Sequence, residues 1–220
     1  MRPALRIAGV LLILLLPLFL WFFLSQGKTH YRKLPVIGDS TVGGTGTSPH
    51  TLPDFRLWTQ DSLPFTRDSL RGWIHVANYF FTRCPGICPR LSQSMYFLQE
   101  ALQGRASQVR LVSYTVDPAH DTPAVLREYA AKYRADLNRW TFVTGPESTL
   151  YRLAREGYLL FTGRLPDTTK GELGLVHSDA LVLVDPDLRL RGFYSGLDSL
   201  HLRKLLDDIG LLLLEYRRPS

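Results

Sequence analysis

Apolar positions along the chain follow two patterns, namely short runs of hydrophobic residues and longer segments with an apolar residue at every third or fourth position. The first pattern is typical of buried strands and the second of amphipathic helices. Trp73–Phe81 is a mostly apolar run rich in β-forming residues, which predicts a buried central strand. Downstream of it, Leu91, Met95 and Leu98 recur at helical spacing and predict a helix.

The same two patterns repeat through the rest of the chain, so that strands alternate with helices. Pro123 suits the first turn of one of these helices, because proline lacks an N–H that a helix leaves unpaired there, and Thr122 suits its N-cap. Such alternation predicts an α/β fold, with a central sheet flanked by helices. We expect strands at Phe55–Trp58, Pro64–Thr66, Val109–Val116, Trp140–Val143, Leu181–Asp185 and Leu188–Tyr194, and helices at Pro123–Tyr133, Glu147–Glu156 and Asp198–Tyr216.

The N-terminal segment Ile7–Leu24 is apolar and carries no charge. As a helix it would extend for roughly 27 Å, enough to cross a bilayer core, so we expect one transmembrane anchor at residues 1–25. A cleaved signal peptide is the alternative, because small and polar residues follow the apolar run. Residues 26–52 are rich in glycine, proline, serine and threonine and predict a flexible linker, which leaves residues 53–220 as one soluble domain.

Composition narrows the classes of protein to which the chain can belong. With 220 residues, 45% of them hydrophobic and 21% charged, it is typical of a globular domain rather than of a disordered or fibrous chain. Two cysteines are too few for a multi-disulfide scaffold or a four-cysteine zinc ribbon. The net charge of +6 is spread thinly, without a basic run, so we expect no nucleic acid among the partners.

Both cysteines lie in the segment that joins the predicted central strand to the following helix, with the spacing Cys84-x-x-x-Cys88. Exposed N–H groups at a helix N-terminus favour a thiolate and lower the pKa of a cysteine there. A helical spacing of four residues also brings both sulfur atoms to one face. The pair then suits a redox dithiol or a site for one soft metal ion, whereas a structural disulfide across so short a loop would stabilise the fold little.

A metal site built on two thiols needs at least one further ligand. Two thiolates with an imidazole suit copper, because sulfur is soft enough for Cu(I) and imidazole also supports Cu(II), whereas zinc usually takes four protein ligands. Among the six histidines, two lie in loops next to predicted strands and suit this role. His177 follows a polar stretch and shortly precedes a strand, and His120 lies in a strand-to-helix loop; the pattern by itself leaves both open.

Three stretches of the chain, taken in order, resemble the Sco/SenC family. Tyr79–Pro89 reads YFFTRCPGICP and is similar to the family's F-x-F-T-x-C-P-x-x-C-P signature, with tyrosine for the first phenylalanine. Val116–Pro123 reads VDPAHDTP and is similar to its V-D-P-x-x-D-T-P stretch, and Val176–Ser178 contains the H-S pair that precedes a strand in the family. The resemblance extends over about residues 34–214, with the stretches in the family's order and spacing.

The resemblance implies a thioredoxin-like fold and a copper site. Carried over to the matching positions, Cys84, Cys88 and His177 would bind copper, as Cu(I), Cu(II) or both. Asp117 and Asp121 match the family's aspartates near that site, and we expect them to orient the ligands or to dock a partner. The alternative for Asp121 is that it only caps the helix that begins at Pro123.

The resemblance also implies a function. We expect a membrane-anchored copper metallochaperone that helps to assemble the binuclear copper site of cytochrome c oxidase, with subunit II of the oxidase as partner and another copper chaperone or a thiol reductant beside it. The alternative is an enzyme, a thiol–disulfide oxidoreductase that uses Cys84 and Cys88 as a redox dithiol and keeps the oxidase cysteines reduced. From the resemblance we also expect the domain on the periplasmic or extracytoplasmic side of a bacterial inner membrane.

Overall fold

The structure, a computed structural model, divides the chain into two compact units, Met1–Arg32 and Lys33–Ser220. In the first unit the described residues are helical, and no helix among the described residues is both long and apolar enough to cross a membrane. The predicted anchor at residues 1–25 lies mostly outside the described part of the chain. The described residues are 13, 15–17, 19, 21–22, 33–38, 50–104, 107–160 and 179–216.

The described part of the second unit is built on a seven-stranded sheet with the strand order β2-β1-β5-β4-β3-β6-β7. β3 pairs in parallel with β4 and antiparallel with β6. Every residue of β3 is buried, as a strand covered on both faces requires. The strands are β1 (Arg56–Thr59), β2 (Pro64–Thr66), β3 (Ile74–Phe80), β4 (Val109–Thr115), β5 (Trp140–Thr144), β6 (Ala180–Val184) and β7 (Leu190–Ser195).

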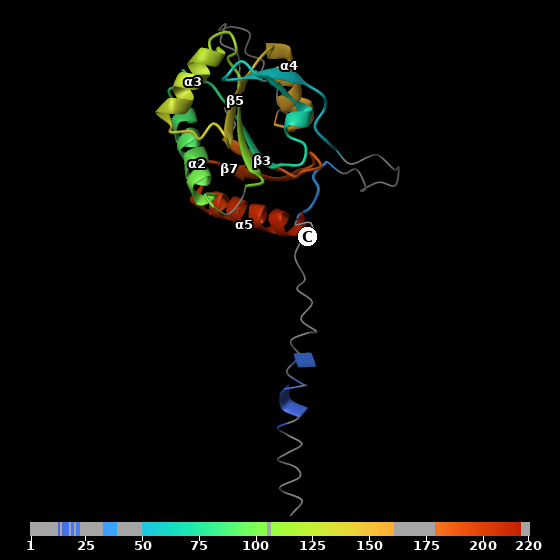
Figure 1. The fold of residues 1–220 in the computed structure, drawn as a ribbon. Coiled ribbons are helices and arrows are strands. Elements are labelled where there is room, and N and C mark those ends of the chain that lie inside the picture. The colour runs from blue at the N-terminus through green and yellow to red at the C-terminus, as the bar shows by residue number, and fades with distance from the viewer. Residues whose placement is uncertain are drawn as a thin grey trace, which may run out of the picture. The chain divides into compact units, whose positions relative to one another are not determined.

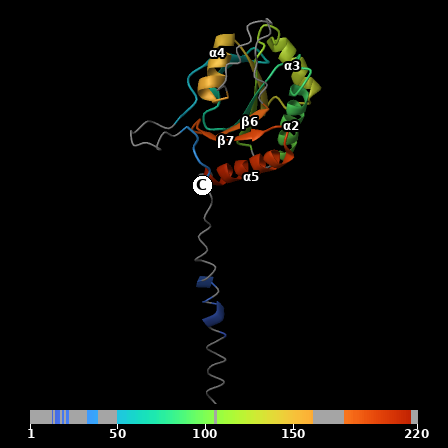
Figure 2. The ribbon, with the colours of Figure 1, turned by 180° about the vertical axis from the view of Figure 1, so that it is seen from behind.

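Helices cover both faces of this sheet, with α2, α3 and α5 along one face and α4 on the other (Figures 1 and 2). The buried side chains agree with this arrangement, because Leu91, Leu126 and Leu205 of the first three helices share one apolar cluster, whereas Leu150 of α4 belongs to a second. The helices are α2 (Cys88–Ala101), α3 (Pro123–Lys132), α4 (Glu147–Arg152) and α5 (Ser199–Glu215), with a short 3-10 helix at Arg67–Ser69.

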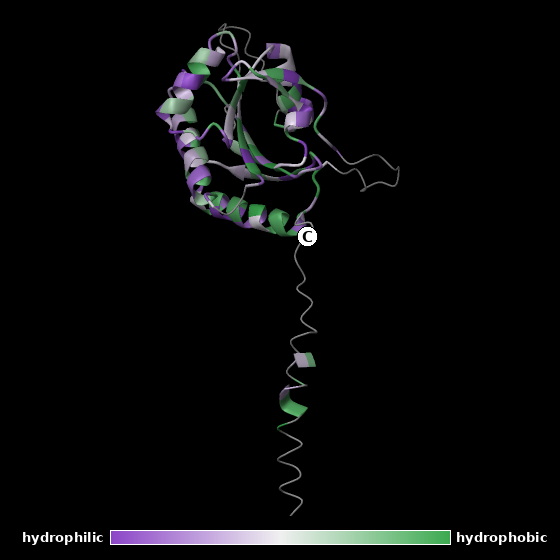
Figure 3. Ribbon diagram, viewed as in Figure 1, coloured by the Kyte–Doolittle hydropathy of each residue, from purple (hydrophilic) through white to green (hydrophobic). Residues whose placement is uncertain are grey.

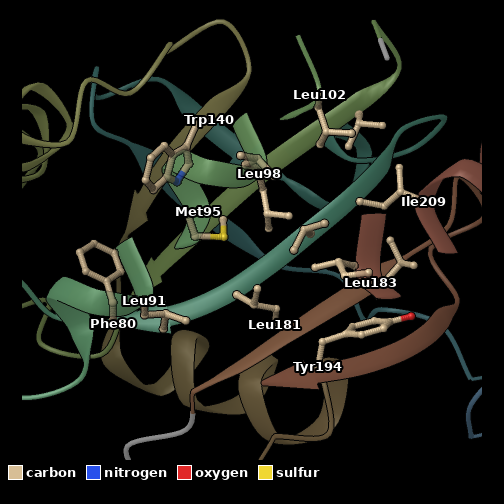
Figure 4. Packing of buried hydrophobic residues seen from close by; sticks show 14 of the residues in the cluster. Phe80, Leu91, Met95, Leu98, Leu102, Trp140, Leu181, Leu183, Tyr194 and Ile209 are labelled. Carbon is tan, nitrogen blue, oxygen red and sulfur yellow. The ribbon is translucent and has the colours of Figure 1, made fainter. Parts of the chain in front are cut away.

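The side chains of β3 alternate between these two clusters. Val76 and Phe80 lie in the cluster beneath α2 and α5, and Ala77 and Tyr79 lie in the other. Figure 4 shows the first cluster, where side chains of α2 pack over those of the sheet. Hydrophobic and hydrophilic residues are mixed along α2 and α3 (Figure 3), as amphipathic helices with one solvent face require.

The predicted strands and helices are present, with shifts of a residue or two at their ends. Thr122 caps α3 as predicted, its hydroxyl accepting a backbone N–H of the first turn. The helix predicted at Glu147–Glu156 is an α-helix only as far as Arg152, and Leu153–Gly157 forms a wider π-helical turn. The wider turn ends at Tyr158, whose ring is fully buried in the second cluster, so the change in helix type accompanies the burial of this residue.

Two described stretches of the expected linker, residues 26–52, pack on the sheet. Leu34 and Leu52 are buried. The backbone N–H of Ile37 donates to the carbonyl of Leu190 at 2.8 Å. These stretches therefore lie along the outer edge of β7, the last strand in the sheet order.

Candidate metal centre

The two cysteines lie at the carboxyl end of β3, in the connection to α2. Cys84 lies in the turn and Cys88 is the first residue of α2. Both are free thiols, and their exposed fractions are only 6% and 3%. Pro89 follows in the first turn of α2, where a proline removes no helical hydrogen bond. The predicted strand–turn–helix setting of the motif is thus confirmed.

Donor groups surround the sulfur atom of Cys84. Burial opposes ionisation of this thiol, but hydrogen bonds from the Cys88 thiol and from the backbone N–H groups of Cys88, Gly86 and Ile87 outweigh burial. Together they hold the pKa of Cys84 below its ordinary value. These N–H groups stand at the beginning of α2, so the helix terminus stabilises a thiolate at this position.

The thiol of Cys88 has the opposite character. Burial disfavours its thiolate, and both the hydrogen bond to Cys84 and the charge of Asp121 add to that effect. A hydrogen bond with the backbone of Phe81 works in the other direction but is too weak to prevail, and the pKa of Cys88 rises to about 12. Cys84 therefore ionises more easily than Cys88.

Asp121 links the beginning of the cysteine turn to the end of β4. Its carboxylate is fully buried and accepts the backbone N–H of Thr82 at 3.1 Å. It also accepts the hydroxyl groups of Thr82 and of Thr115, the last residue of β4. Thr82 lies two residues before Cys84, so these bonds fix the start of the turn that carries the first thiol. Sequence reasoning missed both threonines, because Thr82 is 39 positions from Asp121 and no helical or strand spacing links Thr115 to Asp121.

Asp117 lies closer to the surface than Asp121. Its carboxylate pairs with the guanidinium of Arg83 at 2.6 Å, and the exposed fractions of the two side chains are 15% and 61% respectively. Arg83 directly precedes Cys84, so this ion pair stands beside the thiol on the solvent side. Asp121 and Asp117 were predicted to have the same role, and the structure gives them different surroundings.

The predicted third ligand, His177, lies outside the described residues. The other candidate, His120, is partly exposed in the turn between β4 and α3, where its backbone N–H donates to the carbonyl of Asp117 at 3.1 Å. Among the described residues, no three histidine, cysteine, aspartate or glutamate side chains are grouped so that they could hold a metal ion. Of the three predicted metal ligands, the described residues therefore include only Cys84 and Cys88.

His75 lies within β3 and is fully buried. Its Nε2 is 3.1 Å from the hydroxyl of Tyr158, which in turn is 2.9 Å from that of Tyr114. Burial lowers the pKa of His75 to about 3, so the imidazole is neutral at pH 7. This polar chain belongs to the cluster of Tyr79, whereas both cysteines belong to the cluster of Phe80 on the opposite face of the sheet.

The chemistry of the two thiols fits a soft metal ion. The two thiols lie close enough to shift each other's pKa, so an ion held by one of them is also within reach of the other. A pair of thiolates selects Cu(I), and an added imidazole extends the range to Cu(II). The same unequal pair is suited to thiol–disulfide exchange, with Cys84 as the attacking thiolate.

Comparisons with known proteins place this arrangement in a family. The sequence profile described as SCO1/SenC matches residues 44–209 of the chain. The SCO1 protein homolog of Bacillus subtilis is 29% identical over 161 residues, which are 73% of this chain and 81% of that protein. A Stutzerimonas stutzeri protein named for copper binding is 38% identical over 143 residues, which are 64% of this chain and 67% of that protein.

Solved structures agree in fold. BsSco, a member of the Sco family of cytochrome c oxidase assembly proteins with a disulfide switch, superposes with a TM-score of 0.64 at 27% identity, covering 74% of this chain and 93% of that one. Copper-bound ScoI of Bradyrhizobium japonicum superposes with a TM-score of 0.60 at 22% identity, covering 74% and 99% of the two chains. A matched profile over most of the chain and the shared fold of a central sheet between helices show that the chain belongs to the SCO1/SenC family.

Proposed function

We propose that this protein carries copper on Cys84, Cys88 and His177 and delivers it to the binuclear copper site of cytochrome c oxidase. The observation that carries the proposal is the pair of free, buried thiols four residues apart at the turn between β3 and α2, close enough to shift each other's pKa. Relatives support it, because copper is bound in the solved Sco proteins of Bradyrhizobium japonicum and Arabidopsis thaliana. Two thiolates with an imidazole form a donor set that suits copper.

The two thiols would act in sequence during copper uptake. Cys84, whose pKa is lowered, is the thiol that offers a thiolate to an incoming ion. Cys88 must then lose a proton that burial and its neighbours favour, so uptake releases a proton and depends on pH. Asp121 keeps the turn in place throughout, through its bonds to Thr82. The imidazole of His177 would complete the site.

Delivery would proceed by exchange of ligands with the cysteines and histidines of oxidase subunit II. Both cysteines are nearly covered, so a partner has to bind at the turn that carries them. The ion pair of Arg83 and Asp117 beside Cys84 offers charged groups of both signs for docking at this point. Another copper chaperone would load the site, or a thiol reductant would restore its dithiol.

The membrane anchor belongs to the same proposal. The apolar segment Ile7–Leu24 would hold the domain at a bacterial inner membrane, on the periplasmic side where the oxidase copper site is assembled. A Bacillus anthracis member of the family is a lipoprotein, which is another way of attaching such a domain to a membrane.

A copper titration of the reduced, metal-free chain tests the proposal. We expect one copper per chain, with thiolate-to-Cu(II) absorption that Cys84→Ser abolishes and His177→Ala alters while lowering the affinity. His120→Ala is the matched control, because this histidine lies in the neighbouring turn and should leave the titration unchanged. Failure of the reduced wild type to bind copper tightly would overturn the proposal in favour of thiol–disulfide exchange by Cys84 and Cys88.

A further inference from the structure

The cysteine turn occupies one end of the domain, and the opposite end has a surface of a different kind. β3, β4 and β5 are parallel, so their carboxyl ends lie together near the turn and their amino ends lie together away from it. β7 begins at that second end as well, since two antiparallel pairings separate it from β3. α5 ends there, because its Glu215 pairs with Arg191 near the beginning of β7 at 2.7 Å. We define the amino-end face by the side chains at this end that are exposed or only partly buried and that carry the argument, namely Lys33, Trp73, Arg110, Arg139, Leu213 and Leu214.

Two arginines of this face have no acidic partner. Neither Arg110 nor Arg139 has a carboxylate within ion-pair distance among the residues that the structure describes. Burial lowers the pKa of Arg110, and the charge of Arg139 lowers it further, while the charge of Asp136 works in the other direction. The Asp136 carboxylate accepts the backbone N–H and the side-chain amide of Asn138, both at 3.1 Å. Two neighbouring cations without a paired anion favour an anion from outside the chain.

An aromatic ring and exposed leucines accompany the two arginines. The guanidinium of Arg110 lies 4.0 Å from the centre of the Trp73 ring, which is only partly buried. Hydrophobic residues continue to the end of α5 (Figure 3), where Leu214 is 46% exposed. Tryptophan, basic residues and leucine on one surface are typical of proteins that lie on a bilayer, where the ring sits at the level of the headgroups and the cations meet anionic lipids.

The chain enters the domain at this same end. The carbonyl of Leu34, the second residue of the domain, accepts the guanidinium of Arg191 at 2.9 Å, near the beginning of β7. In the sequence, residues 25–32 separate the apolar segment that ends at Leu24 from Lys33. A chain of that length spans at most about 32 Å. Of the two ends of the domain, the amino-end face is therefore the one that a membrane anchor at residues 1–25 would keep close to a bilayer.

We propose that the amino-end face rests on the bilayer and binds the phosphate groups of anionic phospholipids. The inference rests on the membrane anchor of the proposed function and adds to it a contact surface and a class of lipid. β3 has 7 residues, so the cysteine turn stands roughly 20 Å from this face. The contact would therefore hold Cys84 and Cys88 on the side of the domain that is turned away from the lipid.

Protection of single arginines from chemical modification tests the inference. The full chain is placed in nanodiscs of phosphatidylcholine, with or without phosphatidylglycerol, and modified with p-hydroxyphenylglyoxal, and peptide mass spectrometry gives the rate for each arginine. We expect Arg110 and Arg139 to react about fivefold more slowly with phosphatidylglycerol present, the factor by which one basic residue near an anionic surface favours the bound state. High salt should remove this protection. Arg90 is the matched control, because it is an exposed arginine in the first turn of α2, at the cysteine end.

A neutral variant separates lipid binding from general crowding by the disc. Arg110→Gln should reduce the protection of Arg139, whereas Arg90→Gln should leave it unchanged. Equal rates for Arg110 in the two kinds of disc would overturn the inference, as would an equal slowing of Arg90. Inorganic phosphate that protects both arginines to the same degree in discs of phosphatidylcholine alone would assign them to a free anion, which also overturns the membrane contact.

The outcome for the amino-end face can be told apart from the outcome for the proposed function. Copper titration reports on the cysteine end of the domain, so a failure of arginine protection leaves the proposed copper site intact. A chain that is not retained in the discs would overturn the proposed anchor. Vesicles of the same two lipid compositions, added to that chain, then give the same comparison of rates at Arg110, Arg139 and Arg90, and it decides the inference in the same way.

Discussion

Replacement of Asp121 by alanine is expected to lower the free energy of unfolding by about 3–5 kcal/mol. The carboxylate is fully buried and accepts the Thr82 N–H at 3.1 Å together with the hydroxyls of Thr82 and Thr115. Alanine leaves these buried donors without their acceptor, and each unpaired buried group costs about 1–3 kcal/mol. The two hydroxyls can rotate toward other acceptors, whereas the N–H cannot. The total loss of stability is therefore smaller than three full penalties for unpaired groups.

Urea unfolding of the reduced, metal-free domain from residue 33 to 220 measures this loss. With a slope of about 2.5 kcal/mol per molar urea, the midpoint should fall by about 1.5 M. Asp117→Ala is the matched control, because it removes an ion pair whose arginine is mostly exposed, and we expect it to cost less than about 1 kcal/mol. Equal losses for the two variants, or a loss below about 1 kcal/mol for Asp121→Ala, would refute the reasoning that burial separates the two aspartates.

Two further predictions concern titration. Burial lowers the pKa of His75 from 6.5 to about 3, so the unfolded chain takes up this proton first and stability falls as the pH drops below 6.5. The free energy of unfolding should fall by about 2 kcal/mol between pH 7.5 and pH 5 because of His75. Urea unfolding of His75→Leu should lack this fall. The same dependence of stability on pH in His75→Leu and in the wild type would contradict the prediction. In the reduced protein, iodoacetamide should alkylate Cys84 before Cys88, because Cys84 has the lowered pKa and Cys88 the raised one. The rate of Cys84 alkylation should rise with pH and reach half its maximum below pH 9.0. Peptide mass spectrometry assigns the modified thiol, and faster labelling of Cys88 would reverse the assignment.

The positions of strands and helices, and the setting of the thiols, follow from local features of the sequence. The apolar run at Trp73–Phe81 predicts β3, and Pro123 with Thr122 predicts the beginning of α3. Cys84 and Cys88 occupy a turn whose strand and helix are its immediate neighbours in the chain. Periodicity and helix signals act over a few residues, so such features can be predicted without knowledge of the rest of the fold.

Only the tertiary structure distinguished the polar residues that lie close together in the chain. Asp117 and Asp121 are near neighbours, yet one pairs with Arg83 at the surface and the other is buried against Thr82, which is 39 positions away. The partner of His75 is 83 positions away.

Asp179 and Ser195 likewise meet because β6 pairs with β7, and Gly196 meets Ser94 because the turn after β7 packs on α2. The sequence by itself determined which segments become strands or helices and where the thiols stand. Which polar side chains are buried, and what each of them holds, was decided by the packing of segments far apart in the chain, because no local pattern specifies which segments the sheet brings side by side.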